Sequence, residues 1–148
     1  MKKTIFITGA TSGIGKATAE VFAKQGHRLI ICGRRKEVLD NLQIQLSNFT
    51  DVYSLVFDVR NQQEVQNAIN SLPEDWKNID VLVNNAGNAH GLEPISDANI
   101  SDWDAMMDGN VKGLLYVSQP IIKLMKANNS GHIVNISSVA ARQTYANG

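Results

Sequence analysis

The chain has 148 residues, with 14 basic and 14 acidic side chains, so its formal net charge at pH 7 is zero. This balance gives no indication of a nucleic-acid-binding protein or of binding to an anionic membrane. The single cysteine, Cys32, excludes a disulfide within the chain, and the N-terminus shows no signal-peptide pattern. No apolar run is long enough to span a bilayer, so we expect a soluble cytoplasmic protein.

Apolar runs and helical periodicities alternate along the chain. Short apolar runs predict strands over residues 4–7, 27–32, 52–57, 80–83 and 132–136. The helices predicted between them carry Ile14, Ala17, Val21 and Phe22; then Val38, Leu39, Leu42 and Leu46; then Val65, Ala68, Ile69 and Leu72; and finally a long series from Trp103 to Met125. This alternation predicts βαβ units with right-handed crossovers, and therefore an α/β fold with a doubly wound parallel sheet of the Rossmann type. Residues 1–148 are expected to form one such domain.

Several residues predict where the helices begin, end or bend. Gly26 is expected to end the first helix, and Asn61 with Glu64 has the spacing of an N-cap residue and a first-turn acid. Ser101 is expected to begin the last helix. Pro120 should kink that helix, because a proline removes one intrahelical hydrogen bond.

A glycine-rich loop follows the first predicted strand, and a helix begins within it. Three glycines at positions 9, 13 and 15 would let a dinucleotide pyrophosphate approach the backbone N–H groups at the positive end of that helix. Taken alone, the triplet could equally be a tight turn. The candidate cofactor residues of this loop are Gly9, Thr11, Ser12, Gly13, Ile14 and Gly15.

The end of the second predicted strand indicates which dinucleotide binds. In a doubly wound fold this point lies beside the adenosine ribose, where an enzyme for NAD would carry a carboxylate. Gly33 stands in that place and is followed by Arg34 and Arg35. Paired guanidinium groups suit a 2′-phosphate, so the sequence predicts NADP. The alternative is a solvated basic turn.

Four stretches resemble the short-chain dehydrogenase/reductase family. Thr8 opens the family's T-G-x-x-x-G-x-G loop, and Asn84 to Gly87 match its N-N-A-G. Asn110 lies in N-x-x-G, and the strand over residues 132–136 leads to a serine pair like the one in the family's active site. The resemblance covers the entire chain, but only the N-terminal part of the family's fold, so we expect the doubly wound sheet to be incomplete at its C-terminal side.

The resemblance implies roles for these residues. The candidate cofactor residues at the later strand ends are Asp58, Val59, Asn85, Ala86 and Gly87. Asn84 would brace the sheet, Asn110 would hold a water that supports a catalytic lysine, and Ser138 would hydrogen-bond the substrate oxygen. Judged without the resemblance, Asp58 could be a helix-entry residue, Asn110 an exposed polar residue, and the serine pair a turn.

The family's proton-transfer pair, Tyr-x-x-x-Lys, does not occur in this chain. Tyr145 is the only tyrosine after Ser138 and lies too close to it, and the family's spacing of about thirteen residues places the expected tyrosine just beyond Gly148. We therefore expect a fragment rather than a shortened relative. The histidines and the cysteine show no ligand-like clustering, so we predict no metal.

Residues 72–80 and 91–94 resemble the NADP-dependent 3-hydroxy acid dehydrogenases, which oxidise serine, allo-threonine and related compounds. The resemblance implies hydride transfer between NADP(H) and a 3-hydroxy acid or a related alcohol or ketone. The alternatives are a ketoacyl-thioester reductase and a catalytically dead NADP-binding module that acts through partners. The long helix carries more apolar residues than one face requires, and its family counterpart joins subunits, which implies a homotetramer.

Overall fold

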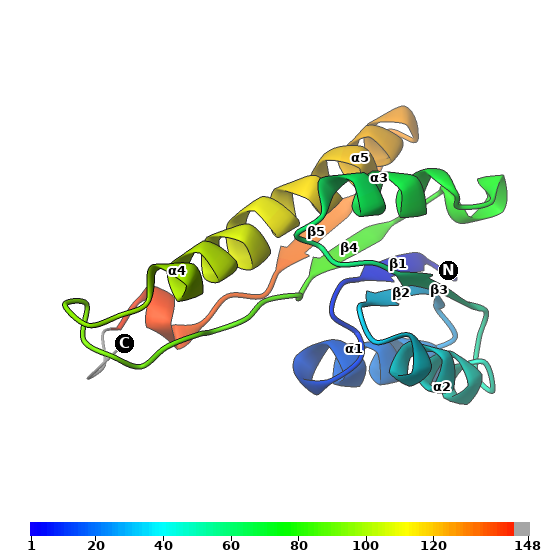
Figure 1. The fold of residues 1–148 in the computed structure, drawn as a ribbon. Coiled ribbons are helices and arrows are strands. Elements are labelled where there is room, and N and C mark those ends of the chain that lie inside the picture. The colour runs from blue at the N-terminus through cyan, green and yellow to red at the C-terminus, as the bar shows by residue number, and fades with distance from the viewer. Residues whose placement is uncertain (144–148) are drawn as a thin grey trace.

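The structure, a computed structural model, describes residues 1–143. One parallel sheet of five strands has the order β3-β2-β1-β4-β5 (Figure 1). Its strands are β1 Thr4–Ile7, β2 Arg28–Gly33, β3 Val52–Val56, β4 Val81–Asn84 and β5 His132–Asn135. The chain runs outward from β1 to β3 and then crosses back to β4 on the other side of β1. The predicted doubly wound parallel sheet is confirmed.

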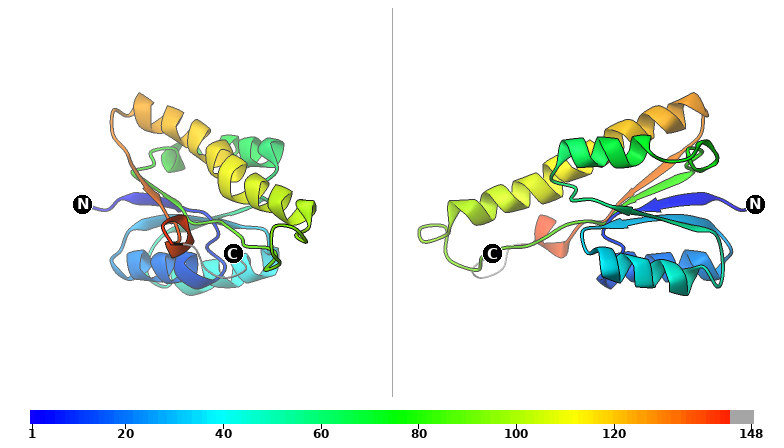
Figure 2. Two further views of the ribbon diagram at one scale, coloured as in Figure 1. Left: turned by 90° about the vertical axis from the view of Figure 1, so that its left-hand side faces the viewer. Right: turned by 45° about the vertical axis from the view of Figure 1, so that its right-hand side comes forward.

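Helices cover both faces of this sheet (Figure 1 and Figure 2). Helices α1 (Gly13–Lys24) and α2 (Lys36–Leu46) cover one face, and α3 (Gln62–Asn70) and α5 (Gly113–Ala127) cover the other. Successive strand side chains point to opposite faces. In β1, Ile5 and Ile7 therefore pack with α1 and α2, whereas Phe6 packs with α3 and α5. All three are buried, which explains why the strand reads as a continuous apolar run.

The buried face of α1 consists of small residues. Gly15, Ala19 and Ala23 are buried against the sheet, whereas Ile14 is 60% exposed and Val21 is 53% exposed. The start of the helix lies so close to the neighbouring loops that no Cβ fits at Gly15. Ile14 and Val21 lie on another face of the helix and stay in solvent, so the apolar spacing predicted the helix correctly without marking its buried face.

Two of the predicted helix boundaries are confirmed. Gly26 follows the end of α1 with φ of +79°, and the Asn61 side chain accepts hydrogen bonds from the first-turn backbone of α3. The prediction for Ser101 was wrong, because the N-cap of α4 (Ile100–Met106) is Asn99, whose side-chain oxygen accepts from the backbone N–H of Ser101 at 3.0 Å. A side chain that can cap does so only where the backbone enters the helix.

The last helix is continuous but irregular. Helix α4 passes into a π-helical segment, η2 (Met107–Lys112), and then into α5, which runs through Pro120 without interruption. Wider π turns are common at functional sites. Helix α4 and the short 3-10 helix η3 (Val139–Ala141) extend past the carboxyl ends of β4 and β5 (Figure 1).

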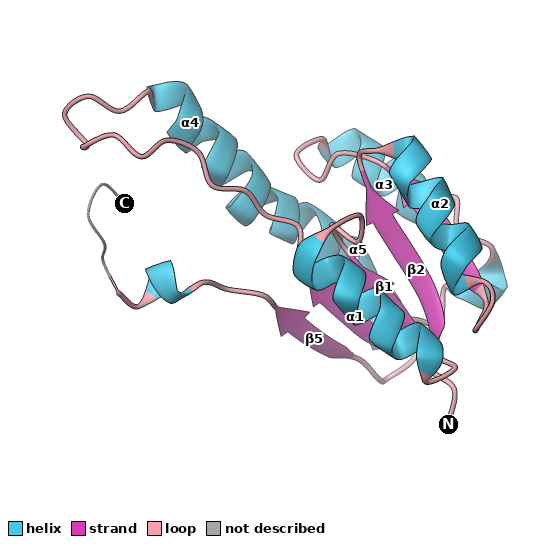
Figure 3. Ribbon diagram, turned by 90° about the horizontal axis from the view of Figure 1, so that it is seen from below, coloured by secondary structure: helices cyan, strands magenta, loops and turns pink. Residues whose placement is uncertain are grey.

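Strand β5 forms one edge of the sheet (Figure 3). Its Ile133 and the following Ile136 are each 37% exposed, unlike the apolar residues of the inner strands. A second 3-10 helix, η1 (Glu74–Trp76), precedes β4 at the opposite end of the sheet. Among the described residues, no helix has both the length and the apolar character needed to cross a membrane.

Candidate functional site

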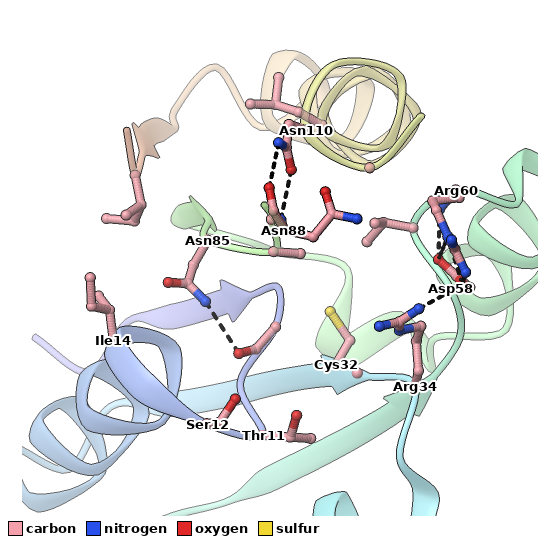
Figure 4. Close-up of a pocket in the computed structure, with 18 of the residues that line it drawn as sticks. Thr11, Ser12, Ile14, Cys32, Arg34, Asp58, Arg60, Asn85, Asn88 and Asn110 are labelled. Carbon is pink, nitrogen blue, oxygen red and sulfur yellow. Dashed lines mark hydrogen bonds and ion pairs between the residues drawn. The ribbon is translucent and has the colours of Figure 1, made fainter. Parts of the chain in front are cut away.

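A cleft of about 1000 Å³ opens at the carboxyl ends of the strands (Figure 4). Loops that follow all five strands contribute to it, together with η2. Most of the predicted site residues line it: Gly9, Thr11, Ser12, Ile14, Arg34, Arg35, Asp58, Val59, Asn85, Ala86, Gly87, Asn110 and Ser138. The fold thus brings together residues that are far apart in the chain. Gly13 and Gly15 do not line the cleft. They contribute instead to the conformation and the packing of the glycine loop.

The glycines of the first loop are required for three separate reasons. Gly9 has φ of +64°, and a Cβ on it would lie 2.9 Å from Ala86 Cα. A Cβ on Gly15 would collide with the Asn85 side chain and the Gly9 carbonyl. Gly13 has φ of +54° and open space around it, so its backbone conformation alone favours glycine. The loop is therefore packed tightly against the β4 end, and its outer side is free for a ligand.

Thr8 and Asn85 join the glycine loop to the loop after β4. The Thr8 Oγ1 accepts hydrogen bonds from the backbone N–H groups of Asn85 and Ala86, both at 2.9 Å. The Asn85 Nδ2 in turn donates to the carbonyls of Thr8 at 3.0 Å and Gly9 at 3.2 Å. These four bonds fix the two loops to each other and explain why a threonine precedes the first glycine.

Asn84 connects three elements inside the protein. Its side chain is buried, and its Nδ2 donates to Ser118 Oγ in α5 and to Asn135 Oδ1 in β5, each at 2.9 Å. These bonds satisfy the buried N–H groups of the amide, whereas its Oδ1 is buried without a partner among the described residues. The contacts agree with the bracing role that the resemblance implies for Asn84.

Asn110 lies within the π-helical segment η2 and faces the loop after β4. Its Oδ1 accepts from the backbone N–H of Asn88 and its Nδ2 donates to the Asn88 carbonyl, both at 2.8 Å (Figure 4). A Cβ on Gly87 would lie 3.2 Å from the Asn110 Oδ1, so the loop approaches this side chain closely. In the structure Asn110 therefore positions the loop backbone directly, a contact that the sequence did not indicate.

The two arginines after β2 reach different sides of the cleft. The Arg34 Nη1 lies 3.4 Å from Asp58 Oδ2, whereas the Arg35 Nη2 donates to Thr11 Oγ1 at 2.9 Å. A Cβ on Gly33 would lie 2.8 Å from Thr11 Cγ2, so the end of β2 adjoins the glycine loop. The Arg35 guanidinium thus contacts the glycine loop, whereas that of Arg34 faces the loop after β3.

Asp58 is held chiefly by Arg60, a residue that sequence reasoning missed. The Arg60 Nη2 donates to Asp58 Oδ2 at 2.6 Å, and the Arg60 Nε lies 3.1 Å from the other carboxylate oxygen. Partial burial raises the pKa of Asp58, but hydrogen bonds from Arg60 and the charges of Arg60 and Arg34 outweigh it, so the pKa lies below its usual value. No signal in the sequence indicated this ion pair, because an acid and an arginine two residues apart in a loop have no fixed relative orientation.

Ser138 and Cys32 present different chemistry to the cleft. Ser138 is exposed, and its Oγ accepts from the backbone N–H of Ala140 at 3.2 Å, which caps η3. The thiol of Cys32 is buried and donates to the Ile7 carbonyl at 3.2 Å. Burial raises its pKa far above the usual range, against a smaller lowering by a hydrogen bond with Gly9, so the neutral thiol is favoured over the reactive thiolate. Tyr145 lies outside the described residues.

Comparison with known proteins identifies the family. The family model described as short chain dehydrogenase matches residues 3–148. The chain belongs to this family. It is 44% identical over 144 residues to the NADP-dependent 3-hydroxy acid dehydrogenase YdfG of Escherichia coli O6:H1, covering 97% of this chain and 57% of that protein. It is 42% identical to sulfoacetaldehyde reductase 2 of Chromohalobacter salexigens, covering 98% of this chain and 58% of that protein.

Solved structures of the family share the fold. The closed form of a serine dehydrogenase complexed with NADP+ is 43% identical with a TM-score of 0.91, over 98% of this chain and 58% of the other. An NAD+-bound xylitol dehydrogenase is 29% identical with a TM-score of 0.93, over 98% of this chain and 56% of the other. The chain therefore spans little more than half the length of these relatives. Structures of this fold contain either NADP+ or NAD+. The side chains at the cleft, and not the fold, therefore determine which dinucleotide binds.

Proposed function

We propose that the protein that contains this chain is an NADP(H)-dependent oxidoreductase, and that residues 1–148 form its cofactor-binding domain. The observation that carries the proposal is the pair Arg34 and Arg35 at the cleft, with Gly33 in place of a ribose-binding acid. The glycine loop lines the cleft and leads into the N-terminus of α1, whose free backbone N–H groups suit a pyrophosphate. The relatives named as NADP-dependent support the same cofactor.

The proposed roles of the other residues follow from their positions at the cleft. NADP(H) supplies or accepts the hydride when it is bound. In the proposed site, Asp58 and Val59 flank the adenine, and the loop of Asn85 to Gly87 packs against the ribose and nicotinamide. Ser138 donates a hydrogen bond to the substrate oxygen, and Asn110 holds the loop and a water for the family's lysine.

The proposed substrate is a 3-hydroxy acid or a related alcohol or ketone. Relatives at 43–44% identity named as 3-hydroxy acid dehydrogenases support this class, and a relative at 42% identity is named as a sulfoacetaldehyde reductase. The alternatives remain a ketoacyl-thioester reductase and a catalytically inactive NADP-binding module. Turnover of L-serine or 3-hydroxybutyrate with NADP by the full-length protein would distinguish a 3-hydroxy acid dehydrogenase from both alternatives.

The cofactor is tested by fluorescence titration of the full-length protein with NADPH and NADH. Two charge-assisted contacts between the arginines and the 2′-phosphate, each weakened by solvent exposure, predict a preference for NADPH of about 10- to 100-fold or larger. Replacing Arg34 and Arg35 together by alanine should remove most of that preference. Equal affinities of the unaltered protein for the two cofactors would contradict the proposal.

A homotetramer in the cytoplasm is also proposed. Apolar side chains that α5 and η2 do not bury against the sheet support a subunit contact: Met107 is 54% exposed, Val111 44%, Leu115 58% and Ile122 37%. The cytoplasm is a reducing compartment, which suits a chain whose cysteine is unpaired. Sedimentation of the full-length protein as a monomer at micromolar concentration would exclude the assembly.

A further inference from the structure

Asp58 has two arginine neighbours whose contacts with it are very unequal (Figure 4). Arg60 holds both carboxylate oxygens: its Nε lies 3.1 and 3.0 Å from them, its Nη2 lies 2.6 Å from Oδ2, and its backbone N–H donates to Oδ1 at 3.0 Å. Arg34 makes a single contact, from Nη1 to Oδ2, at 3.4 Å. Arg60 is therefore the main partner of this carboxylate, and Arg34 is a minor one.

Exposure adds to this difference. The Asp58 side chain is 23% exposed, that of Arg60 is 40% exposed, and that of Arg34 is 63% exposed. A long, single contact from a largely exposed guanidinium contributes little and is easily broken. Arg34 can therefore leave Asp58 for a more highly charged anion, provided that another cation continues to compensate the carboxylate.

Without Arg60, the charges around Asp58 would change in two ways. Arg34 is the only other cation within ion-pair distance of Asp58 among residues 1–143, so the carboxylate would compete for it. Negative charge also gathers beside Asp58, because the Glu64 carboxylate accepts from its backbone N–H at 3.1 Å. Uncompensated, Asp58 would both retain Arg34 and repel a phosphate that approaches Arg34.

We propose that Arg60 is a positioning residue for cofactor specificity: by pairing with Asp58, it leaves Arg34 free to bind the 2′-phosphate of NADP(H). This inference rests on the proposed NADP(H) function. Arg60 acts through Asp58 and Arg34, and it does not itself need to touch the phosphate. The role differs from that of Arg34 and Arg35, whose guanidinium groups are proposed to contact the ligand.

The test compares two adenosine ligands by calorimetry on the full-length protein. Adenosine 2′,5′-bisphosphate carries the 2′-phosphate and 5′-AMP lacks it, so the ratio of their affinities isolates the phosphate while contacts to adenine cancel. Arg60→Gln should lower this ratio about fivefold, which corresponds to about 1 kcal/mol, the upper range for exposed ion pairs. Lys77→Gln is the control, because Lys77 forms an exposed ion pair with Glu74 in η1 and does not line the cleft. It should leave the ratio unchanged.

A second substitution separates positioning from a general structural role. Because the proposed effect of Arg60→Gln passes through the charge of Asp58, adding Asp58→Asn should restore the ratio. Asp58→Asn alone should leave the ratio at or above that of the unaltered protein, which keeps the test available if Arg60→Gln does not fold. Equal weakening of both ligands by Arg60→Gln, or no recovery in the double variant, would overturn the inference. A protein that already fails to distinguish the two ligands would instead contradict the NADP(H) function itself.

Discussion

Replacing Thr8 by valine tests how firmly the two cofactor loops are joined. Valine has nearly the same shape as threonine but places a methyl group where the Thr8 Oγ1 accepts from the backbone N–H groups of Asn85 and Ala86 at 2.9 Å. Thr8 is 2% exposed, so water cannot easily replace the lost acceptor. Both donors would then lose their partner inside the protein.

The expected loss of stability follows from those two donors. A buried donor without a partner costs about 1–3 kcal/mol, and two donors at the margin of the cleft should together cost about 2–4 kcal/mol. This is a large part of the roughly 5–15 kcal/mol by which a typical domain is stable. The affinity for NADPH should fall as well, because the loops would no longer hold their relative positions.

Urea unfolding of the full-length protein, at one fixed protein concentration, measures the effect. Thr50→Val is the matched control, since the Thr50 Oγ1 makes a single long bond of 3.4 Å to the Gly26 carbonyl. That variant should lose less than about 1 kcal/mol. If Thr8→Val and Thr50→Val lose the same stability within about 0.5 kcal/mol, the argument from the paired donors is refuted.

Three further predictions concern the loop, the acid and the chemistry. Gly15→Ala should destabilise the protein by about 1–3 kcal/mol in urea unfolding and weaken NADPH binding, because the added methyl collides with Asn85 and the Gly9 carbonyl; unchanged binding would contradict the tight loop contact. The lowered pKa of Asp58 means that its ion pairs stabilise the fold above the unfolded-state pKa of about 4 and that this contribution is lost as the pH falls through the lower folded-state pKa. Asp58→Asn should therefore cost about 0.5–1 kcal/mol at pH 6 and progressively less as the pH falls below about 4, and a cost in urea unfolding that does not decrease with falling pH would argue against the ion pairs. A polypeptide of residues 1–148 should turn over NADP with L-serine at least about 100-fold more slowly than the full-length protein, because it has no Tyr-x-x-x-Lys to transfer the proton; a rate within tenfold would show that the proton donor lies within these residues.

Patterns of neighbouring residues were sufficient to predict the strands and helices that form the layers of the fold. The β-branched run of β1 and the spacing of Leu39, Leu42 and Leu46 in α2 each reflect burial against one neighbouring layer. Residues buried in this way recur at the spacing of a helix or a strand, and that spacing is visible in the sequence. The capping of α3 by Asn61 is equally local, because donor and acceptor lie within three residues of each other.

The same reasoning failed where two segments approach each other. The sequence shows Ile14 and Val21 at helical spacing, but it does not show that α1 turns its small residues to the sheet and leaves both of these side chains exposed. It also contains both Asn99 and Ser101, and only the path of the chain into α4 decides that Asn99 is the cap. Each of these outcomes depends on distances between segments, which no period along the chain encodes.

By itself, the sequence determined the order of strands and helices, the glycine loop and the presence of two arginines after β2, because each is a property of neighbouring residues. Only the tertiary structure decided that Thr8 accepts from the loop after β4, that Asn110 holds Asn88, and that Arg60 rather than Arg34 is the main partner of Asp58. The physical reason is that hydrogen bonds and ion pairs depend on separations of about 3 Å and on burial. Residues distant in the chain reach those separations only after the sheet has placed its carboxyl ends side by side.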